Sequence, residues 1–312
     1  MSEQNQQAII WQFCDGKAGH ERQSSGLVRA LQEKLRVASF RLETADVRVS
    51  ALDFMRRKFR HGDELPDPDF IVGAGRACQI PMLLAQRARG GHTVYLMNPA
   101  LPRNLFTLCL VPRHDGVKPS SRIIVTEGVL NDLIATDTHG NLGLVLIGGP
   151  SKHYDWDDDD LFRQINRVIA DTGHKKWIIA DSRRTPTTTA ASIGQLATTD
   201  IEIVHHRDAS QAWLADCFAS SDCIWVTRDS VSMLYESLSC GAGVGVLNVP
   251  LKRKSRVTSV VDDLGARGMV TLYDSWHGGL PTRNSKPLAE AARCADLIAA
   301  QWQQRDSGFE RS

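Results

Sequence analysis

The sequence predicts an α/β protein built from two doubly wound, mostly parallel sheets. Short apolar runs alternate with amphipathic stretches of helical periodicity along most of the chain. This alternation starts a second time after a polar segment, DTHGN (residues 137–141). Polar, glycine-rich clusters directly follow several of the apolar runs. Because ligands bind beyond the carboxyl ends of strands in open parallel sheets, these clusters are the expected binding loops.

Each strand is expected where an apolar run ends in glycine, proline or charged residues, and each helix where apolar residues recur every three or four positions. The expected strands are residues 8–13, 38–43, 70–73, 93–97, 105–111 and 123–126, then 142–147, 177–180, 201–205, 223–226, 244–249 and 269–272. The expected helices are residues 22–35, 50–59, 80–89 and 129–135, then 155–170, 187–196, 209–219, 230–240, 256–267 and 286–304.

The second start of the pattern divides the chain into domains at 1–140 and 141–312. The closing helix at 286–304 is free to pack back onto the first domain. With 312 residues, of which 42% are hydrophobic, each domain can bury a large core.

The formal net charge of +1 gives no general attraction of the whole protein to nucleic acid or to an anionic membrane. The first residues lack the basic and apolar regions of a signal peptide, and no apolar run approaches the roughly 18 residues of a membrane helix. We therefore expect a cytoplasmic protein. Its seven cysteines are scattered, which predicts free buried thiols rather than disulfides or metal ligands.

The segment DGKAGHERQ carries the densest chemistry of the first half, at Asp15, Lys17, His20 and Gln23. His20 or Asp15 is a candidate general base, with Lys17 orienting an acceptor and Gln23 facing it. The alternative is a strand-to-helix turn in which Asp15 forms an Asx-turn. The segment matches neither the dinucleotide fingerprint nor the P-loop.

Two further clusters of the first half are candidate cleft residues. In GAGR, the glycines allow close approach of a ligand and Arg76 offers a charge for an anion, although packing glycines explain the motif equally well. His114 and Asp115 follow the strand at 105–111 as a candidate base and its neighbour, or as a surface turn.

In the second half, two clusters predict an anion site. The motif GGPS includes Gly149, whose N–H group is suited to a phosphate. Ser182, Arg183 and Arg184 directly follow a buried strand, and two guanidinium groups beside hydroxyls suit a diphosphate. The alternative is an interdomain salt bridge made by one arginine.

The stretch from 222 to 249 reads as strand, helix, glycine stop and strand. Asp229 or Ser230 is expected to cap the helix with its side chain. Ser230 and Ser232 would meet a phosphate at the helix start. By spacing alone, Glu236 is an exposed helix glutamate.

The remaining polar segments favour structural explanations. The pair His205-His206 is expected at a strand end or on the surface, and DWDDDD (155–160) at a solvated helix start. The basic segment LKRKSR (251–256) is either a solvated loop or a contact with an anionic membrane or a lipid-linked acceptor. No motif predicts a metal site.

Taken in order, DGKAGHERQSSGL, GAGR, VPRHD, LIGGPSKHYDW, SRRTP and TRDSVSMLYES resemble the bacterial branch of the mitochondrial-fission Elm family. The resemblance runs from about residue 9 to residue 272, although GAGR departs from the serine-containing, double-arginine form of that turn. It implies a GT-B-like fold of two Rossmann-like domains facing a cleft, with an acceptor side and a nucleotide-sugar donor side.

The resemblance further implies a glycosyltransferase that uses a nucleotide-sugar as co-substrate, without another cofactor or a metal. It implies a glycan or lipid-linked acceptor in lipopolysaccharide or lipooligosaccharide core assembly, with peripheral contact to the inner membrane surface. By position in the motif, Glu236 would bind the donor ribose. The alternative is a non-catalytic adaptor of the same fold, as in the fission-related relatives; the absent dinucleotide fingerprint disfavours an epimerase that needs such a cofactor.

Overall fold

The computed structural model describes residues 7–135, 140–173 and 176–309, with side chains of the last helix described as far as Trp302. The chain divides into two compact units. The first unit contains Met1–Asp132 together with Ala289–Ser312, and the second contains Leu133–Leu288.

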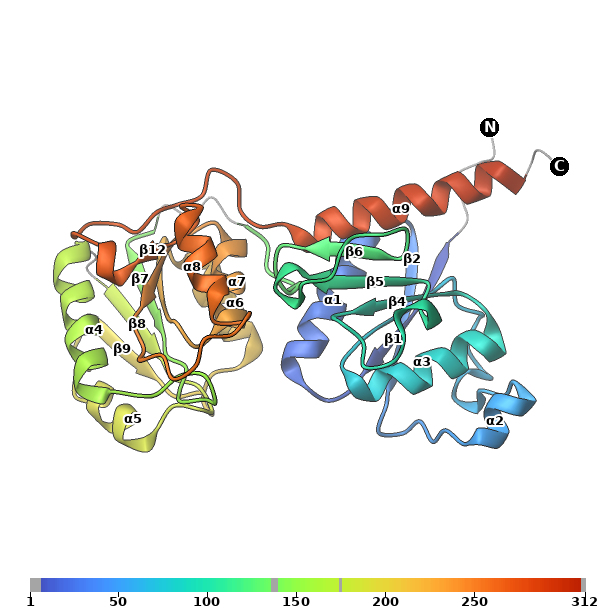
Figure 1. Ribbon diagram of the computed structural model, residues 1–312, viewed down its shortest axis with the longest axis horizontal. Helices are drawn as coiled ribbons and strands as arrows, with labels where there is room; N and C mark the ends of the chain where they lie inside the picture. The colour runs from blue at the N-terminus through green and yellow to red at the C-terminus, as the bar shows by residue number, and fades with distance from the viewer. Residues whose placement is uncertain (1–6, 136–139, 174–175, 310–312) are drawn as a thin grey trace. The chain divides into compact units, whose positions relative to one another are not determined.

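The first unit is built on a six-stranded parallel sheet of order β2-β1-β3-β4-β5-β6 (Figure 1). Its strands are β1 (Ala8–Cys14), β2 (Val37–Glu43), β3 (Phe70–Ala74), β4 (His92–Leu96), β5 (Leu108–Pro112) and β6 (Ile123–Thr126). Its helices are α1 (Ala18–Gln32), α2 (Ala51–Arg56), α3 (Arg76–Arg89) and α9 (Glu290–Phe309).

The second unit repeats this plan with the order β12-β11-β10-β7-β8-β9, also parallel. Its strands are β7 (Leu142–Leu146), β8 (Lys176–Ala180), β9 (Ile201–Val204), β10 (Cys223–Thr227), β11 (Gly243–Leu247) and β12 (Thr271–Leu272). Its helices are α4 (Asp158–Thr172), α5 (Thr187–Gly194), α6 (Gln211–Ser220), α7 (Val231–Cys240) and α8 (Ser259–Ala266).

The prediction of two doubly wound α/β sheets is confirmed. The strand orders also show which loops lie where a ligand is expected to bind. In each sheet the order reverses beside the first strand, between β1 and β3 in one unit and between β7 and β10 in the other. At such a switch point the loops after two neighbouring strands diverge and leave a crevice at the carboxyl edge.

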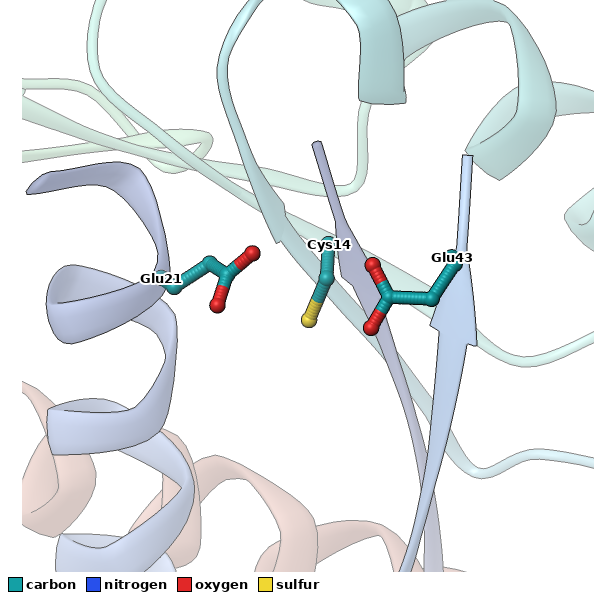
Figure 2. A group of neighbouring side chains, drawn as sticks. All are labelled: Cys14, Glu21 and Glu43. Carbon is teal, nitrogen blue, oxygen red and sulfur yellow. The ribbon is translucent and has the colours of Figure 1, made fainter. Parts of the chain in front are cut away.

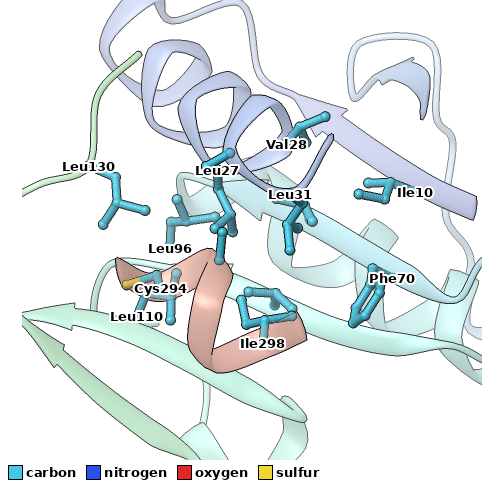
Figure 3. Close-up of a cluster of buried hydrophobic side chains, with 14 of the residues drawn as sticks. Ile10, Leu27, Val28, Leu31, Phe70, Leu96, Leu110, Leu130, Cys294 and Ile298 are labelled. Atoms are coloured by element: carbon cyan, nitrogen blue, oxygen red, sulfur yellow. The ribbon is translucent and has the colours of Figure 1, made fainter. Parts of the chain in front are cut away.

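Both faces of the first sheet are covered, because alternate side chains of a strand point to opposite faces. Ile10 and Phe70 pack with Leu27 and Leu31 of α1 and with Ile298 of α9 (Figure 3). On the other face Trp11, Phe13 and Ile71 pack against α3. The closing helix α9 therefore completes the core of the first unit, although it comes last in the chain.

The second unit also has two cores. One contains Trp177, Trp225 and Trp276 with the inner side of α4, and the other contains Ile224 and Val226 with α6 and α7. All seven cysteines are buried and free, as predicted. Among the described residues, no helix combines the length and apolarity needed to span a membrane.

The helix expected at 129–135 is wrong, because the described residues after β6 run without helical structure. Leu130 is buried in the first core, and the Asn131 backbone lies against Gly26 of α1. A Cβ atom at Gly26 would lie 2.2 Å from the Asn131 carbonyl oxygen. Tertiary packing on α1 therefore overrides the helical pattern.

Candidate functional site

The loop after β1 brings Asp15 and His20 together. Gly16, at a φ of +75°, turns the chain so that α1 begins directly after Lys17. Nδ1 of His20 lies 2.8 Å from Oδ2 of Asp15, whose side chain is only 1% exposed. The carboxylate therefore holds the imidazole in place by Nδ1, which leaves Nε2 for exchange of a proton with a ligand.

The GAGR turn after β3 is the other side of this site. Gly75 has a φ of +88°, and a Cβ atom there would lie 2.3 Å from Nδ1 of His20 and 2.5 Å from Oδ2 of Asp15. The predicted close approach at GAGR is thus made by the protein's own dyad. The two loops flank the switch point between β1 and β3.

The other residues predicted near this dyad in the first unit differ in their exposure to solvent. Lys17 and Arg76 are exposed, each beside the start of a helix, α1 and α3 respectively. Gln23 is 7% exposed on α1 and faces the interior. Gln23 therefore belongs to the packing of α1 rather than to an open acceptor surface.

His114 and Asp115 lie in a single short 3-10 turn, Arg113–Asp115, after β5. Because β5 is two positions from β3 in the sheet, this turn is about 10 Å along the sheet from GAGR. Burial lowers the pKa of His114, although the charge of Asp115 opposes this shift. The structure therefore does not join His114 directly to the Asp15–His20 pair.

In the second unit, the buried carboxylate of Asp229 joins three loops. Its side chain is 0% exposed, and its Oδ2 lies 2.6 Å from a guanidinium nitrogen of Arg184. The same oxygen accepts hydrogen bonds from the Gly149 N–H (3.0 Å) and the Ser230 hydroxyl (3.3 Å). These partners follow β7, β8 and β10, which are neighbours at the switch point of this sheet.

The junction of the three loops held by Asp229 requires both glycines of GGPS. A Cβ atom at Gly148 would lie 2.2 Å from Oδ2 of Asp229, and one at Gly149 would lie 1.9 Å from the Arg184 carbonyl oxygen. The Gly149 N–H is already donated to Asp229, so it is not open to a phosphate in this arrangement.

The two predicted arginines have different surroundings. Arg184 binds Asp229, the Ser230 hydroxyl (2.9 Å) and the Gly149 carbonyl (2.8 Å). It therefore makes a salt bridge within its own unit, where the alternative prediction was an interdomain pair. Arg183 is exposed and forms no ion pair with any residue that the structure describes. The Ser182 hydroxyl is bonded to the Gly148 carbonyl and closes the turn.

The start of α7 is open, contrary to the prediction of a side-chain cap. Ser230 occupies the N-cap position, but its hydroxyl bonds Arg184 and Asp229 and makes no cap hydrogen bond. Ser232 is exposed in the first turn. The first N–H groups of α7 therefore keep the partial positive charge that attracts anions.

Glu236 is 4% exposed, so the alternative of a solvated helix glutamate is wrong. It lies in the middle of α7, where the consecutive residues Leu234 to Cys240 are all buried, so this part of the helix is enclosed by protein around its whole circumference.

Two features were missed as site residues in the sequence. Asp229 was considered only as a helix cap, and its role as a hub depends on the spatial adjacency of β7, β8 and β10. The second feature is Asp181, which binds Nδ1 of His205 (2.7 Å) and both the N–H and Nδ1 of His206 (2.7 and 2.8 Å). The sequence signal for this cluster was that Asp181 directly follows β8 and that the pair His205-His206 directly follows β9, its neighbour in the sheet.

The electrostatics of this cluster favour an ionised Asp181. Burial favours the neutral acid, but the hydrogen bonds from His205 and His206 outweigh it and lower the pKa of Asp181. The histidines do lie at a strand end, as predicted, and they are about one third exposed.

One group of side chains in the first unit has the spacing of a metal site: Cys14, Glu21 and Glu43 point toward one another (Figure 2). Arg41 lies 2.6 Å from a carboxylate oxygen of each glutamate. Burial raises the pKa of the Cys14 thiol to about 11. A metal would have to displace Arg41 and deprotonate this thiol, so the residues fit an ion-pair network better than a metal site.

Comparison with known proteins supports the fold and the family. The chain is 23% identical to an uncharacterized protein of Rickettsia prowazekii, RP120, over 93% of this chain and 97% of that protein. Its structure is similar to a candidate UDP-N-acetylglucosamine 2-epimerase of Listeria monocytogenes, with 11% identity, a TM-score of 0.58 and 98% of each chain covered. It is also similar to the UDP-GlcNAc 2-epimerase of Methanocaldococcus jannaschii, with 10% identity, a TM-score of 0.52 and coverage of 95% of this chain and 100% of that one.

These similarities confirm the GT-B-like class of two Rossmann-like units. The sequence profile of the family described as mitochondrial fission ELM1 matches residues 18–302. Since this match covers most of the chain, the protein belongs to the mitochondrial fission ELM1 family.

Proposed function

We propose that the protein is a metal-independent glycosyltransferase that transfers a sugar from a nucleotide-sugar to a glycan or lipid-linked acceptor. The observation that carries this proposal is the junction at the switch point of the second sheet, where Asp229, Arg184 and Ser230 hold three loops beside the uncapped start of α7. An uncapped helix start beside a cation is a general means of binding phosphate.

In this proposal the donor diphosphate binds at the start of α7. Ser232 and the exposed Arg183 contact the diphosphate directly. Arg184 and Ser182 shape the loop after β8, and Gly149 leaves room for that loop to pack closely against it. Positive groups of the protein would then stabilise the leaving diphosphate, as a metal ion does in other enzymes. Glu236 is the candidate partner of the donor ribose.

The first unit would supply the acceptor chemistry. His20, held by Asp15, would remove the proton of the acceptor hydroxyl through Nε2, and Lys17 would orient the acceptor. Arg76, His114 and Asp115 are further candidates on the acceptor side, whereas the buried Gln23 is not. The acceptor class proposed is a lipopolysaccharide or lipooligosaccharide core, made at the cytoplasmic side of the inner membrane, with 251–256 as a candidate contact to that membrane.

The first experiment is a calorimetric binding panel of UDP-, GDP-, ADP- and CMP-sugars. UDP-GlcNAc comes first, because the two similar structures are UDP-GlcNAc 2-epimerases or candidates for that activity. Binding should weaken about tenfold or more in Arg183→Met, since a charged contact to phosphate is lost. The control is Arg163→Met, which removes an exposed arginine on α4 that pairs with Asp160 one turn earlier in the same helix.

If no nucleotide-sugar of the panel binds, the glycosyltransferase proposal fails and a non-catalytic adaptor of the same fold is the better explanation. Equal affinities of Arg183→Met and Arg163→Met would place the diphosphate elsewhere.

A further inference from the structure

We infer that the segment from Arg48 to His61 in the first unit is a docking surface for a membrane that contains anionic lipid. This surface is distinct from the basic segment at 251–256 and is independent of the proposed enzymatic function. It consists of the short helix α2, the chain before it and the basic run that follows it.

The first support is an exposed apolar pair on α2. No residue of this helix is buried, and its Leu52 and Met55 are 44% and 71% exposed. Residues three positions apart lie on the same face of a helix, so the two side chains form one apolar spot. Phe54 packs into the core on the other side, and Nε of Arg87 donates to its carbonyl oxygen at 2.8 Å. The helix is thus held firmly while its apolar pair faces outward.

The second support is the charge around this pair. Residues 46–61 contain five basic residues, Arg48, Arg56, Arg57, Lys58 and Arg60, against the two acidic residues Asp46 and Asp53. All five basic residues are exposed, and within the described chain none forms an ion pair within 4 Å. Arginines elsewhere in this unit, such as Arg41 and Arg89, do pair with carboxylates.

The third support is a hollow of about 470 Å³ beside the helix. Its polar lining is Arg48, Lys58, Arg60, His61, Ser50 and the two acidic residues Asp46 and Asp53, and its apolar lining is Leu52, Phe59 and Leu84. The Ser50 hydroxyl and N–H donate to the carboxylate of Asp53, which lowers the pKa of Asp53 and keeps it ionised. The three cations Arg48, Lys58 and Arg60 nevertheless outnumber the carboxylates of Asp46 and Asp53, so the hollow keeps a net positive lining. Its size and charge suit a phosphate-bearing headgroup.

The combination favours a lipid surface over other polyanions. An exposed apolar pair inserts below the headgroups of a bilayer, while arginine and lysine remain at the level of the phosphates. A nucleic acid or an acidic protein would match the charges but would not require Leu52 and Met55 to be exposed.

The test is co-sedimentation of the full-length protein with vesicles of phosphatidylcholine, with and without roughly one third phosphatidylglycerol. Each basic residue near an anionic surface contributes about 1 kcal/mol, or about fivefold in partitioning. The variant Arg56→Gln/Lys58→Gln/Arg60→Gln should therefore lose on the order of 100-fold in binding, and 0.5 M salt should weaken the wild type.

Two matched variants make the assignment specific. Arg163→Gln/Lys176→Gln/Arg207→Gln removes the same charge from exposed positions of the second unit and should retain most of the binding. Leu52→Ser/Met55→Ser keeps every charge and should weaken binding, because the inserted apolar area is lost. All these side chains are exposed, so thermal unfolding should stay near that of the wild type.

The inference fails if the wild type does not bind anionic vesicles or if the two charge variants lose binding equally. Unchanged vesicle binding by Leu52→Ser/Met55→Ser would also overturn it, in favour of a purely electrostatic surface for a nucleic acid or an acidic protein.

Discussion

The imidazole of His20 is held by the buried carboxylate of Asp15, with 2.8 Å between Nδ1 and Oδ2. Asp15, in the loop after β1, and His20, in the first turn of α1, thus supply a group that orients a base and the base itself, which is the arrangement of a general base in many enzymes. If His20 acts on the acceptor, His20→Ala should lower turnover at least 100-fold and leave nucleotide-sugar affinity unchanged. The exposed His277→Ala is the control. Turnover within about tenfold of the wild type would remove His20 from the mechanism.

The glycine at 75 should be needed to preserve this dyad. Gly75 and Gly90 share a positive φ and an extended ψ, which side chains other than glycine strongly disfavour. Nothing lies within 4 Å of a Cβ atom at Gly90, whereas one at Gly75 meets both His20 and Asp15. Gly90→Ala should therefore cost only the backbone strain, about 1–3 kcal/mol, and Gly75→Ala should cost more. Urea unfolding measures both, and equal losses would mean that the close approach is not significant.

A similar comparison tests the junction in the second unit. A Cβ atom at Gly149 would lie 1.9 Å from the Arg184 carbonyl oxygen, so Gly149→Ala must displace backbone and should destabilise this unit by about 1–3 kcal/mol or more. Gly194 in α5 is exposed with open space around it. Gly194→Ala should be neutral or stabilising by up to about 1 kcal/mol, since alanine favours a helix. Thermal unfolding distinguishes the two, and a neutral Gly149→Ala would contradict the packing described.

The adjacent arginines should separate stability from binding. Arg184→Met leaves the carboxylate of Asp229 buried without its cation. We expect a loss of about 1–2 kcal/mol in unfolding free energy, less than for a fully buried pair because Arg184 is 44% exposed. Arg183→Met should stay within about 0.5 kcal/mol of the wild type, as is usual at exposed positions. A large loss in Arg183→Met would show that it has a structural partner.

The stability contributed by Asp181 should depend on pH. Its folded-state pKa is lowered mainly by His205 and His206, against the effect of burial. The folded protein thus favours the ionised form, so this contribution is fully present above the ordinary carboxyl pKa and is lost as the pH falls through the lower folded value. Urea midpoints should separate wild type and Asp181→Asn at pH 7 and converge as the pH falls below the ordinary carboxyl pKa of about 4. A difference that grows on acidification would contradict this assignment.

Local patterns in the sequence were sufficient for the fold class. The alternation of buried strands with amphipathic helices depends on residues near one another in the chain, and it located all twelve strands of the described structure to within a few residues. The same local patterns placed DGKAGH, GAGR, GGPS and SRRT at strand ends. Because parallel strands bring their carboxyl ends to one edge, the loops that carry Asp15 and Arg184 could be predicted without coordinates.

What the tertiary structure decided is which of these groups are partners. The sequence treated Arg183 and Arg184 alike, but only Arg184 reaches Asp229, because β8 and β10 both flank β7. Spacing alone left Glu236 on the surface, whereas the packing of α7 buries it. The sequence also predicted a helix after β6, where the described residues form none and the Asn131 backbone packs against Gly26. Periodicity along a chain determines what kind of element forms. Burial and pairing depend on contacts between residues far apart in that chain, which only the order of the strands and the packing of the helices determine.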